Sequence, residues 1–201
     1  MTHVRPIRLG ISRCLLGDHV RYDGGHKRNR FVTEVLGKYV EWVPVCPEVE
    51  AGLGTPREPM QLVGRKNGPR LVTVSTRQDR TTLLKGFSTQ KMRELRALGL
   101  SGFVFKSRSP SCGIEKVPVY DGHGVARSEG IGVFAQAFRK AFPRAPITDE
   151  DCLTDPAFRD EFLNQVYRYH DQKNRMKKSM LRRSGGHQRK RTGIGRRRGA
   201  R

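Results

Sequence analysis

Three of the four cysteines follow segments that are predicted to be strands. They are Cys14 after residues 7–12, Cys46 after residues 40–45, and Cys112 after residues 102–106. In an open parallel sheet the carboxyl ends of the strands meet at one edge, where ligands bind. We therefore expect these three thiols to lie close together. Because free cysteines are among the most buried residues, three ordinary packing thiols are the alternative.

The loops around these cysteines favour a binding role. Cys46 follows Pro44 and precedes Pro47, and Cys112 lies in the polar loop 107–113. Three thiolates select soft metals, either zinc or an iron–sulfur cluster. A structural zinc site takes four ligands, usually in close pairs, whereas three distant cysteines fit a cubane [4Fe-4S] cluster with one iron left open. Cys152 lies away from these segments, and we interpret it as a semi-exposed thiol without a role.

Charge is distributed unevenly along the 201 residues, whose net charge is +21. Residues 172–201 hold 13 Lys and Arg and no Asp or Glu. Such a segment cannot bury apolar surface, so we expect a disordered basic tail. No apolar run approaches the roughly 20 residues of a membrane span. The N-terminus lacks a signal peptide, so the expected location is the cytoplasm, where thiols stay reduced.

Strand and helix patterns alternate along the chain. Strands are expected at residues 7–12, 40–45, 71–75 and 102–106, and helices at 29–38, 79–98, 131–142 and 157–170. This order predicts a three-layer α/β fold, with a mostly parallel sheet, helices on both faces and the cysteine site at the carboxyl ends of the strands. The predicted units are a domain at 1–145, a linker and helix at 146–171, and the tail at 172–201.

Several separated motifs resemble the thiouracil desulfidase family, long known as a domain of unknown function. They are ISRCLLG at 11–17, VRYDG at 20–24, VCPEVEAGLGTPR at 45–57, FKSRSPSCG at 105–113 and GIGVF at 130–134. The resemblance spans roughly residues 6–142. It implies a 4Fe-4S cluster on Cys14, Cys46 and Cys112, and desulfuration of 2-thiouracil, 4-thiouracil or 4-thiouridine to uracil.

A second resemblance begins after the family motifs. The segments LTDP at 153–156 and FRDEF at 158–162 are similar to the start of a second domain found in tRNA 4-thiouridine desulfidases. This similarity ends after Gln172, where the basic tail stands instead. The substrate is therefore left open among a free thiolated base, a nucleoside and tRNA.

The implied reaction replaces C=S by C=O without net redox change. Sulfur binds the open iron, which makes the attached carbon electrophilic, and water attacks that carbon. Glu48, two residues from Cys46, is the expected catalytic base. Its alternatives are capping the following helix or pairing with Arg57.

The remaining candidate residues each have a second interpretation. Ser109 is expected to hydrogen-bond the base or the nascent oxyanion, whereas Ser111 contacts substrate or only caps its loop. Asp23 orients a base edge or serves as a turn residue. Four arginines are candidate phosphate contacts or simple charge balance: Arg13, Arg21, Arg57 and Arg108.

A different class of function also fits the composition. The 172–201 tail can contact RNA nonspecifically through counterion release. A noncatalytic basic RNA-binding protein, with a structural metal held by cysteines, is therefore the alternative to the desulfidase.

Overall fold

Four parallel strands form the central sheet of the computed structural model, which describes residues 6–65 and 68–188. In spatial order they are β2 (Glu41–Val45), β1 (Arg8–Ser12), β5 (Phe103–Phe105) and β8 (Ile147–Asp149). Each neighbouring pair is parallel. The inner strands β1 and β5 are almost completely buried, which explains why their sequences are apolar on both faces.

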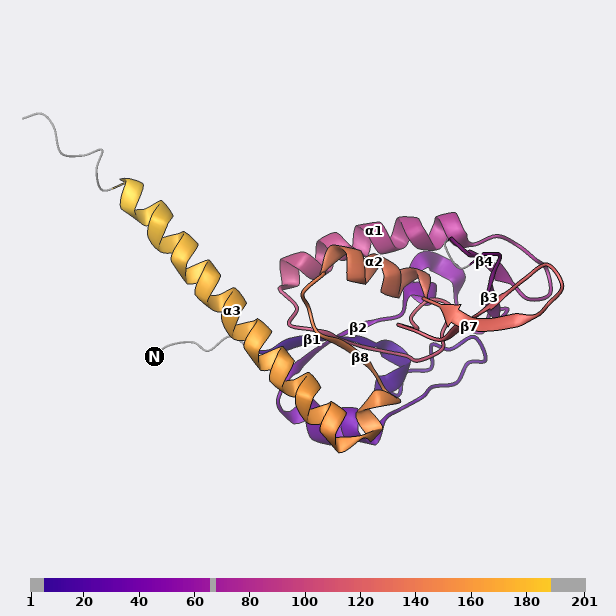
Figure 1. Cartoon of the computed structure of the whole chain (residues 1–201), viewed down its shortest axis with the longest axis horizontal. Helices are drawn as coiled ribbons and strands as arrows, with labels where there is room; N and C mark the ends of the chain where they lie inside the picture. Colours follow the sequence, from indigo (N-terminus) through magenta and orange to yellow (C-terminus); the bar gives the residue numbers. More distant parts are fainter. Residues whose placement is uncertain (1–5, 66–67, 189–201) are drawn as a thin grey trace, which may run out of the picture.

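Helices cover both faces of this sheet (Figure 1). On one face lie α1 (Thr81–Leu98) and α2 (Val133–Ala141), packed against the side chains of Phe103 and Phe105. On the other lie a π-helical turn (Phe31–Val35), a 3-10 turn (Leu36–Lys38) and the start of α3 (Pro156–Gln188). The predicted three-layer α/β fold is confirmed. The expected helix at 29–38 is present only as the two short turns.

A second sheet lies beside the first and was not expected. Its order is β4 (Arg70–Thr73), β3 (Met60–Val63), β6 (Val117–Tyr120) and β7 (Ala126–Gly130). Only the β3–β6 pair is parallel, and the other two pairs are antiparallel. The strand expected at 71–75 therefore belongs to this mixed sheet. Its strands are joined by short connections that leave no room for a crossover helix between β3 and β4 or between β6 and β7.

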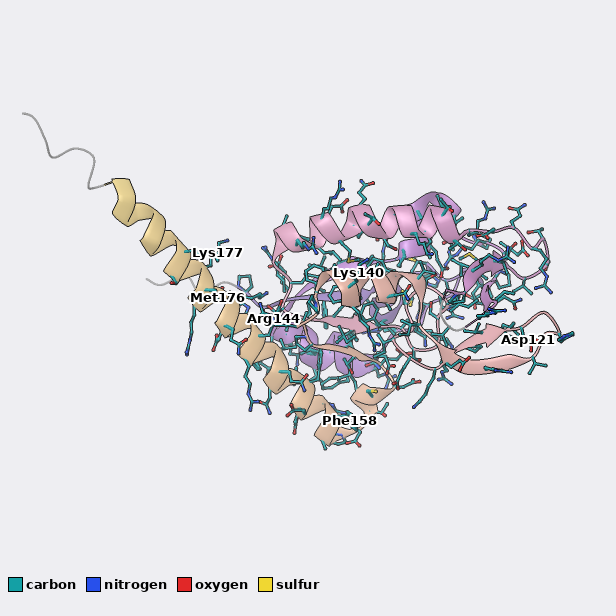
Figure 2. The ribbon with its side chains drawn as sticks, turned by 45° about the horizontal axis from the view of Figure 1, so that its top comes forward. Asp121, Lys140, Arg144, Phe158, Met176 and Lys177 are labelled. Carbon is teal, nitrogen blue, oxygen red and sulfur yellow. The ribbon has the colours of Figure 1, made fainter. Side chains whose placement is uncertain are left out.

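Helix α3 starts on the body of the protein and then leaves it. The Asp155 carboxylate accepts a hydrogen bond from the Ala157 backbone N–H at 2.8 Å, and Phe162 and Val166 are buried against the sheet. The C-terminal half projects outward (Figure 1), with Met176 and Lys177 along it (Figure 2). The helix contains the predicted segment 157–170 and continues through Gln188. Residues 189–201 of the predicted tail lie outside the described residues. No described helix is both long and apolar enough to span a bilayer.

Candidate active site

The three cysteines meet at one cavity on the carboxyl edge of the central sheet. Cys14 lies in a 3-10 turn that follows β1, Cys46 directly follows β2, and Cys112 lies in the loop after β5. All three line a cavity of about 460 Å³. Cys46 lies 32 positions after Cys14 in the sequence, and Cys112 lies 66 positions after Cys46. They are brought together because parallel strands end at the same edge of the sheet.

The backbone around each cysteine is held by local hydrogen bonds. The Cys14 carbonyl accepts from the backbone N–H of Lys27 at 2.9 Å. The Cys46 N–H donates to the Glu50 carboxylate at 2.8 Å, and the Cys112 N–H donates to the Ser109 hydroxyl oxygen at 3.1 Å. The three loops are therefore fixed independently of any ligand in the cavity.

Burial controls the ionisation of these thiols. It raises the pKa of Cys14 to about 11, with the nearby Cys46 adding to the effect. Burial also raises the pKa of Cys46 and, most strongly, that of Cys112. Cys46 adds to the raised pKa of both Cys14 and Cys112, and Cys14 adds to that of Cys112, as expected for groups that share a cavity. Thiolates in such a place need a cation beside them.

The spacing of the donors bears on the kind of metal. Among residues 6–65 and 68–188, no three His, Cys, Asp or Glu side chains are grouped as a single ion would require. In a cubane cluster each thiolate binds a different iron, so its ligands need not converge on one point. Three thiols around a cavity of this volume, without a fourth, are a donor set that fits a cluster with one iron free of protein ligands.

Glu48 reaches the same cavity and is held on both sides. Its Oε2 accepts hydrogen bonds from the guanidinium of Arg57, with the Nε distance at 2.8 Å, and its Oε1 accepts from the Ser111 hydroxyl at 2.6 Å. The side chains of Glu48 and Arg57 are only 13% and 8% exposed. Of the alternatives left open by the sequence, pairing with Arg57 is present. A carboxylate has about four acceptor positions, so this arrangement leaves room for a water molecule.

Comparison with known proteins decides the family. The model of the 2-thiouracil desulfurase family matches residues 9–150, which is most of the chain and includes the whole cavity. The chain belongs to this family. The resemblance noted in the sequence motifs is thereby confirmed.

Two relatives extend the comparison. The solved structure of a [4Fe-4S]-dependent thiouracil desulfidase, TudS, superposes with a TM-score of 0.60 at 30% identity, over 77% of this chain and 98% of the other. An uncharacterized protein of Bacillus subtilis (strain 168), YbbK, is 29% identical over 108 residues, which are 51% of this chain and 71% of YbbK. The desulfurase-family fold therefore includes the central sheet and the cysteine-lined edge.

The two serines of the 105–113 motif, Ser109 and Ser111, make different contacts from those expected from the sequence. Ser109 lines the cavity, but its hydroxyl oxygen accepts from the backbone N–H groups of Ser111 at 3.3 Å and Cys112 at 3.1 Å, and so closes the loop. Ser111 is fully buried and donates to Glu48. The loop-capping geometry expected for Ser111 is thus made by Ser109, and Ser111 contacts the expected base.

The other expected substrate contacts already have partners. Asp23 is not part of the cavity wall, and its carboxylate accepts from the Gly25 N–H at 2.9 Å, as a turn residue does. The four arginines all line the cavity, and each is paired with a carboxylate: Arg13 with Asp18, Arg21 with Asp23, Arg57 with Glu48, and Arg108 with Asp151. Their charges are therefore partly compensated within the protein.

Several cavity residues were not expected from the sequence. Lys106 lines the cavity and donates to the carboxylate of Glu150, which also accepts from the Ser107 N–H at 2.7 Å. Lys27 and Tyr22 also line the cavity. Two basic residues, Lys106 and Arg108, follow β5, and the acidic residues 149–151 lie at the end of β8, its neighbour in the sheet. Their opposite charges were the signal that could have predicted this contact.

Gly132 gives a direct test of how tightly the Cys112 loop is held. A Cβ at this position would lie 2.5 Å from the carbonyl carbon and oxygen of Ser111 and 2.7 Å from the backbone nitrogen of Cys112. We expect Gly132→Ala to lower the free energy of unfolding by about 1–3 kcal/mol, because backbone rather than a flexible side chain must move. Urea denaturation of the two proteins measures this difference.

Gly86→Ala is the matched control for that substitution. Gly86 lies inside α1, and a Cβ there meets no atom within 4 Å. Alanine is favoured over glycine in a helix interior, so this variant should be more stable than the wild type by about 0.5–1 kcal/mol. If both variants changed stability in the same direction, the proposed crowding of the Cys112 loop would be wrong.

Proposed function

We propose that the chain removes sulfur from thiolated uracil, giving uracil, with a [4Fe-4S] cluster held by Cys14, Cys46 and Cys112. The observation that carries the proposal is the convergence of these three cysteines on one cavity wall. Membership of the 2-thiouracil desulfurase family and the 30% identity with a [4Fe-4S]-dependent relative support it. When bound by these three thiolates, such a cluster would supply a Lewis acid with affinity for soft sulfur, which would make the carbon attached to that sulfur more electrophilic.

The protein's own residues then prepare the water. Glu48 has its orientation fixed by Arg57 and Ser111, and its remaining acceptor positions can receive a proton from a water molecule. Glu48 passes that proton to the departing sulfur, followed by the second proton that the added oxygen loses as C=O forms, so C=S and H2O give C=O and hydrogen sulfide with no net redox change.

Anaerobic purification and iron–sulfur reconstitution test this function. The proposal expects a brown protein, with broad absorption near about 400 nm typical of cubane clusters, that converts 2-thiouracil and 4-thiouracil to uracil. A colourless protein that carries one zinc ion and leaves thiouracil intact would contradict it, and would favour the noncatalytic RNA-binding alternative.

We further propose that 4-thiouridine within RNA, including tRNA, reaches the site with help from the projecting part of α3. Residues 172–188 of this helix contain six Lys and Arg and no acidic residue. Arg175 and Lys177 are exposed, and Lys177 lies where the helix projects from the body (Figure 2). A row of cations displaces counterions from a phosphate backbone, which gives salt-dependent binding.

Charge reversal on α3 tests the RNA contact. We expect the double variant Arg175→Glu, Lys177→Glu to weaken tRNA binding by at least about tenfold at low salt and to flatten its salt dependence, because two phosphate contacts are lost. Turnover of free thiouracil should not change. Filter binding between 50 and 200 mM salt measures the slope.

The control changes charge equally on the body. Arg139→Glu with Lys140→Glu reverses two exposed cations on α2, and Figure 2 shows the position of Lys140. If both double variants weakened tRNA binding by the same factor, net charge rather than α3 would explain the affinity. Substitutions are preferable to truncation at 172, because the Lys173 ammonium donates to the carbonyls of Gly99 and Leu100 on the body.

A further inference from the structure

Tyr22 is an aromatic side chain in the wall of the cysteine-lined cavity that has no role so far. Among the described residues that line this cavity it is the one aromatic residue, and it keeps 42% of its surface exposed. The chemistry described above accounts for the sulfur atom and for water. It leaves open what holds the flat pyrimidine ring.

The backbone that carries Tyr22 is fixed to the catalytic side of the cavity. The Tyr22 carbonyl accepts from the backbone N–H of Arg57 at 2.9 Å, and the guanidinium of Arg57 donates to the Val20 carbonyl at 3.0 Å. The same Val20 carbonyl lies 3.7 Å from the Cys46 sulfur. The ring is thus held at a set position relative to both Cys46 and the Arg57–Glu48 pair.

A tight turn prevents this segment from moving away. The backbone N–H of Arg21 donates to the Gly25 carbonyl at 3.2 Å, and that of Gly24 donates to the Arg21 carbonyl at 3.0 Å. The Arg21 guanidinium lies 5.2 Å from the centroid of the Tyr22 ring, within the range of a cation–π contact. These contacts orient the ring, while no hydrogen bond to its hydroxyl is present among the described residues.

We propose that Tyr22 is the stacking platform for the thiolated pyrimidine and so determines the specificity of the cavity for a planar ring. This inference rests on the proposed function and assigns to it a residue that touches the substrate. Stacking of a base on an aromatic ring contributes to affinity whatever the polar groups of the base. A ring held on Tyr22, between Cys46 and Glu48, would have both its sulfur and the attached carbon placed for reaction.

The test pairs a change in the ring with a change in the substrate. For 2-thiouracil, Tyr22→Leu is expected to raise KM by about 5- to 150-fold, the usual range for loss of one base–aromatic contact, with much less effect on kcat. Tyr22→Phe should keep the wild-type KM, since the described residues make no hydrogen bond to the hydroxyl. Wild-type protein should also prefer 2-thiouracil to 5,6-dihydro-2-thiouracil, whose ring is not planar, and Tyr22→Leu should lose that preference.

Tyr39→Leu is the control, because Tyr39 is 67% exposed and is not part of the cavity wall. The proposal is overturned if Tyr22→Leu leaves KM within twofold, or if it raises KM for the planar and non-planar substrates equally. Failure of the proposed function is a separate result, namely no turnover by the reconstituted wild type. In that case equilibrium dialysis of 2-thiouracil decides: stacking stands only if wild type binds it and Tyr22→Leu binds at least about fivefold more weakly.

Discussion

Replacing any one of Cys14, Cys46 and Cys112 with serine is expected to abolish desulfuration and the cluster absorption together. Serine keeps the size of the side chain but removes the soft donor that iron–sulfur clusters require. Because all three residues line one cavity, the loss of one should impair binding of the whole cluster and not of a single iron. Iron and sulfide content, visible absorption and thiouracil turnover measure the effect.

Cys152→Ser provides the matched control. Cys152 is half-buried in a 3-10 turn after β8, and it is not part of the cavity wall. This variant should keep full iron content and activity. If Cys152→Ser lost the cluster, or if one of the three cavity variants kept four irons and full turnover, the assigned ligand set would be wrong. Folding is checked by urea denaturation, since removing a buried thiol from Cys112 also changes core packing.

The central sheet and the place of the cysteines were predictable because both follow from local pattern and one topological rule. Apolar segments at β1, β2 and β5 are separated by helical patterns, which makes the connections crossovers and the strands parallel. Once the strands are parallel, residues just after them must share an edge. Cys14, Cys46 and Cys112 therefore converge without any close spacing in sequence.

The partners of the site residues were less predictable because they depend on contacts between distant loops. The pairing of Glu48 with Ser111 joins the loops after β2 and β5, and no sequence pattern near either residue predicts it. Asp23 and Tyr22 are neighbours, and only the course of their turn decides which of them faces the cavity. The second sheet was missed for a similar reason, since its strands are short and pair across the chain.

Glu48→Gln is expected to reduce kcat by about 10²- to 10⁴-fold while the cluster absorption is retained. Glutamine keeps the shape of the side chain and an oxygen that can accept from Ser111, but it cannot take a proton from water. The charge of Arg57 is then left without its partner at a site where the side chain is 8% exposed. We expect a loss of about 3 kcal/mol in unfolding free energy, at the low end for a broken buried pair, because Arg57 still donates to the Val20 and Gly54 carbonyls.

Two further variants separate catalysis from that loss of stability. Glu48→Gln combined with Arg57→Met removes both charges, so it should recover stability by about 1–3 kcal/mol relative to the single variant. If Glu48 were only structural, activity would return together with stability. If Glu48 accepts the proton from water, kcat of the double variant should stay low. Glu58→Gln is the outside control, since that carboxylate holds the Thr76 N–H at 2.8 Å away from the cysteine-lined cavity. If the double variant recovered turnover, Glu48 would not be the catalytic base, and its role would be only to hold Arg57 in place.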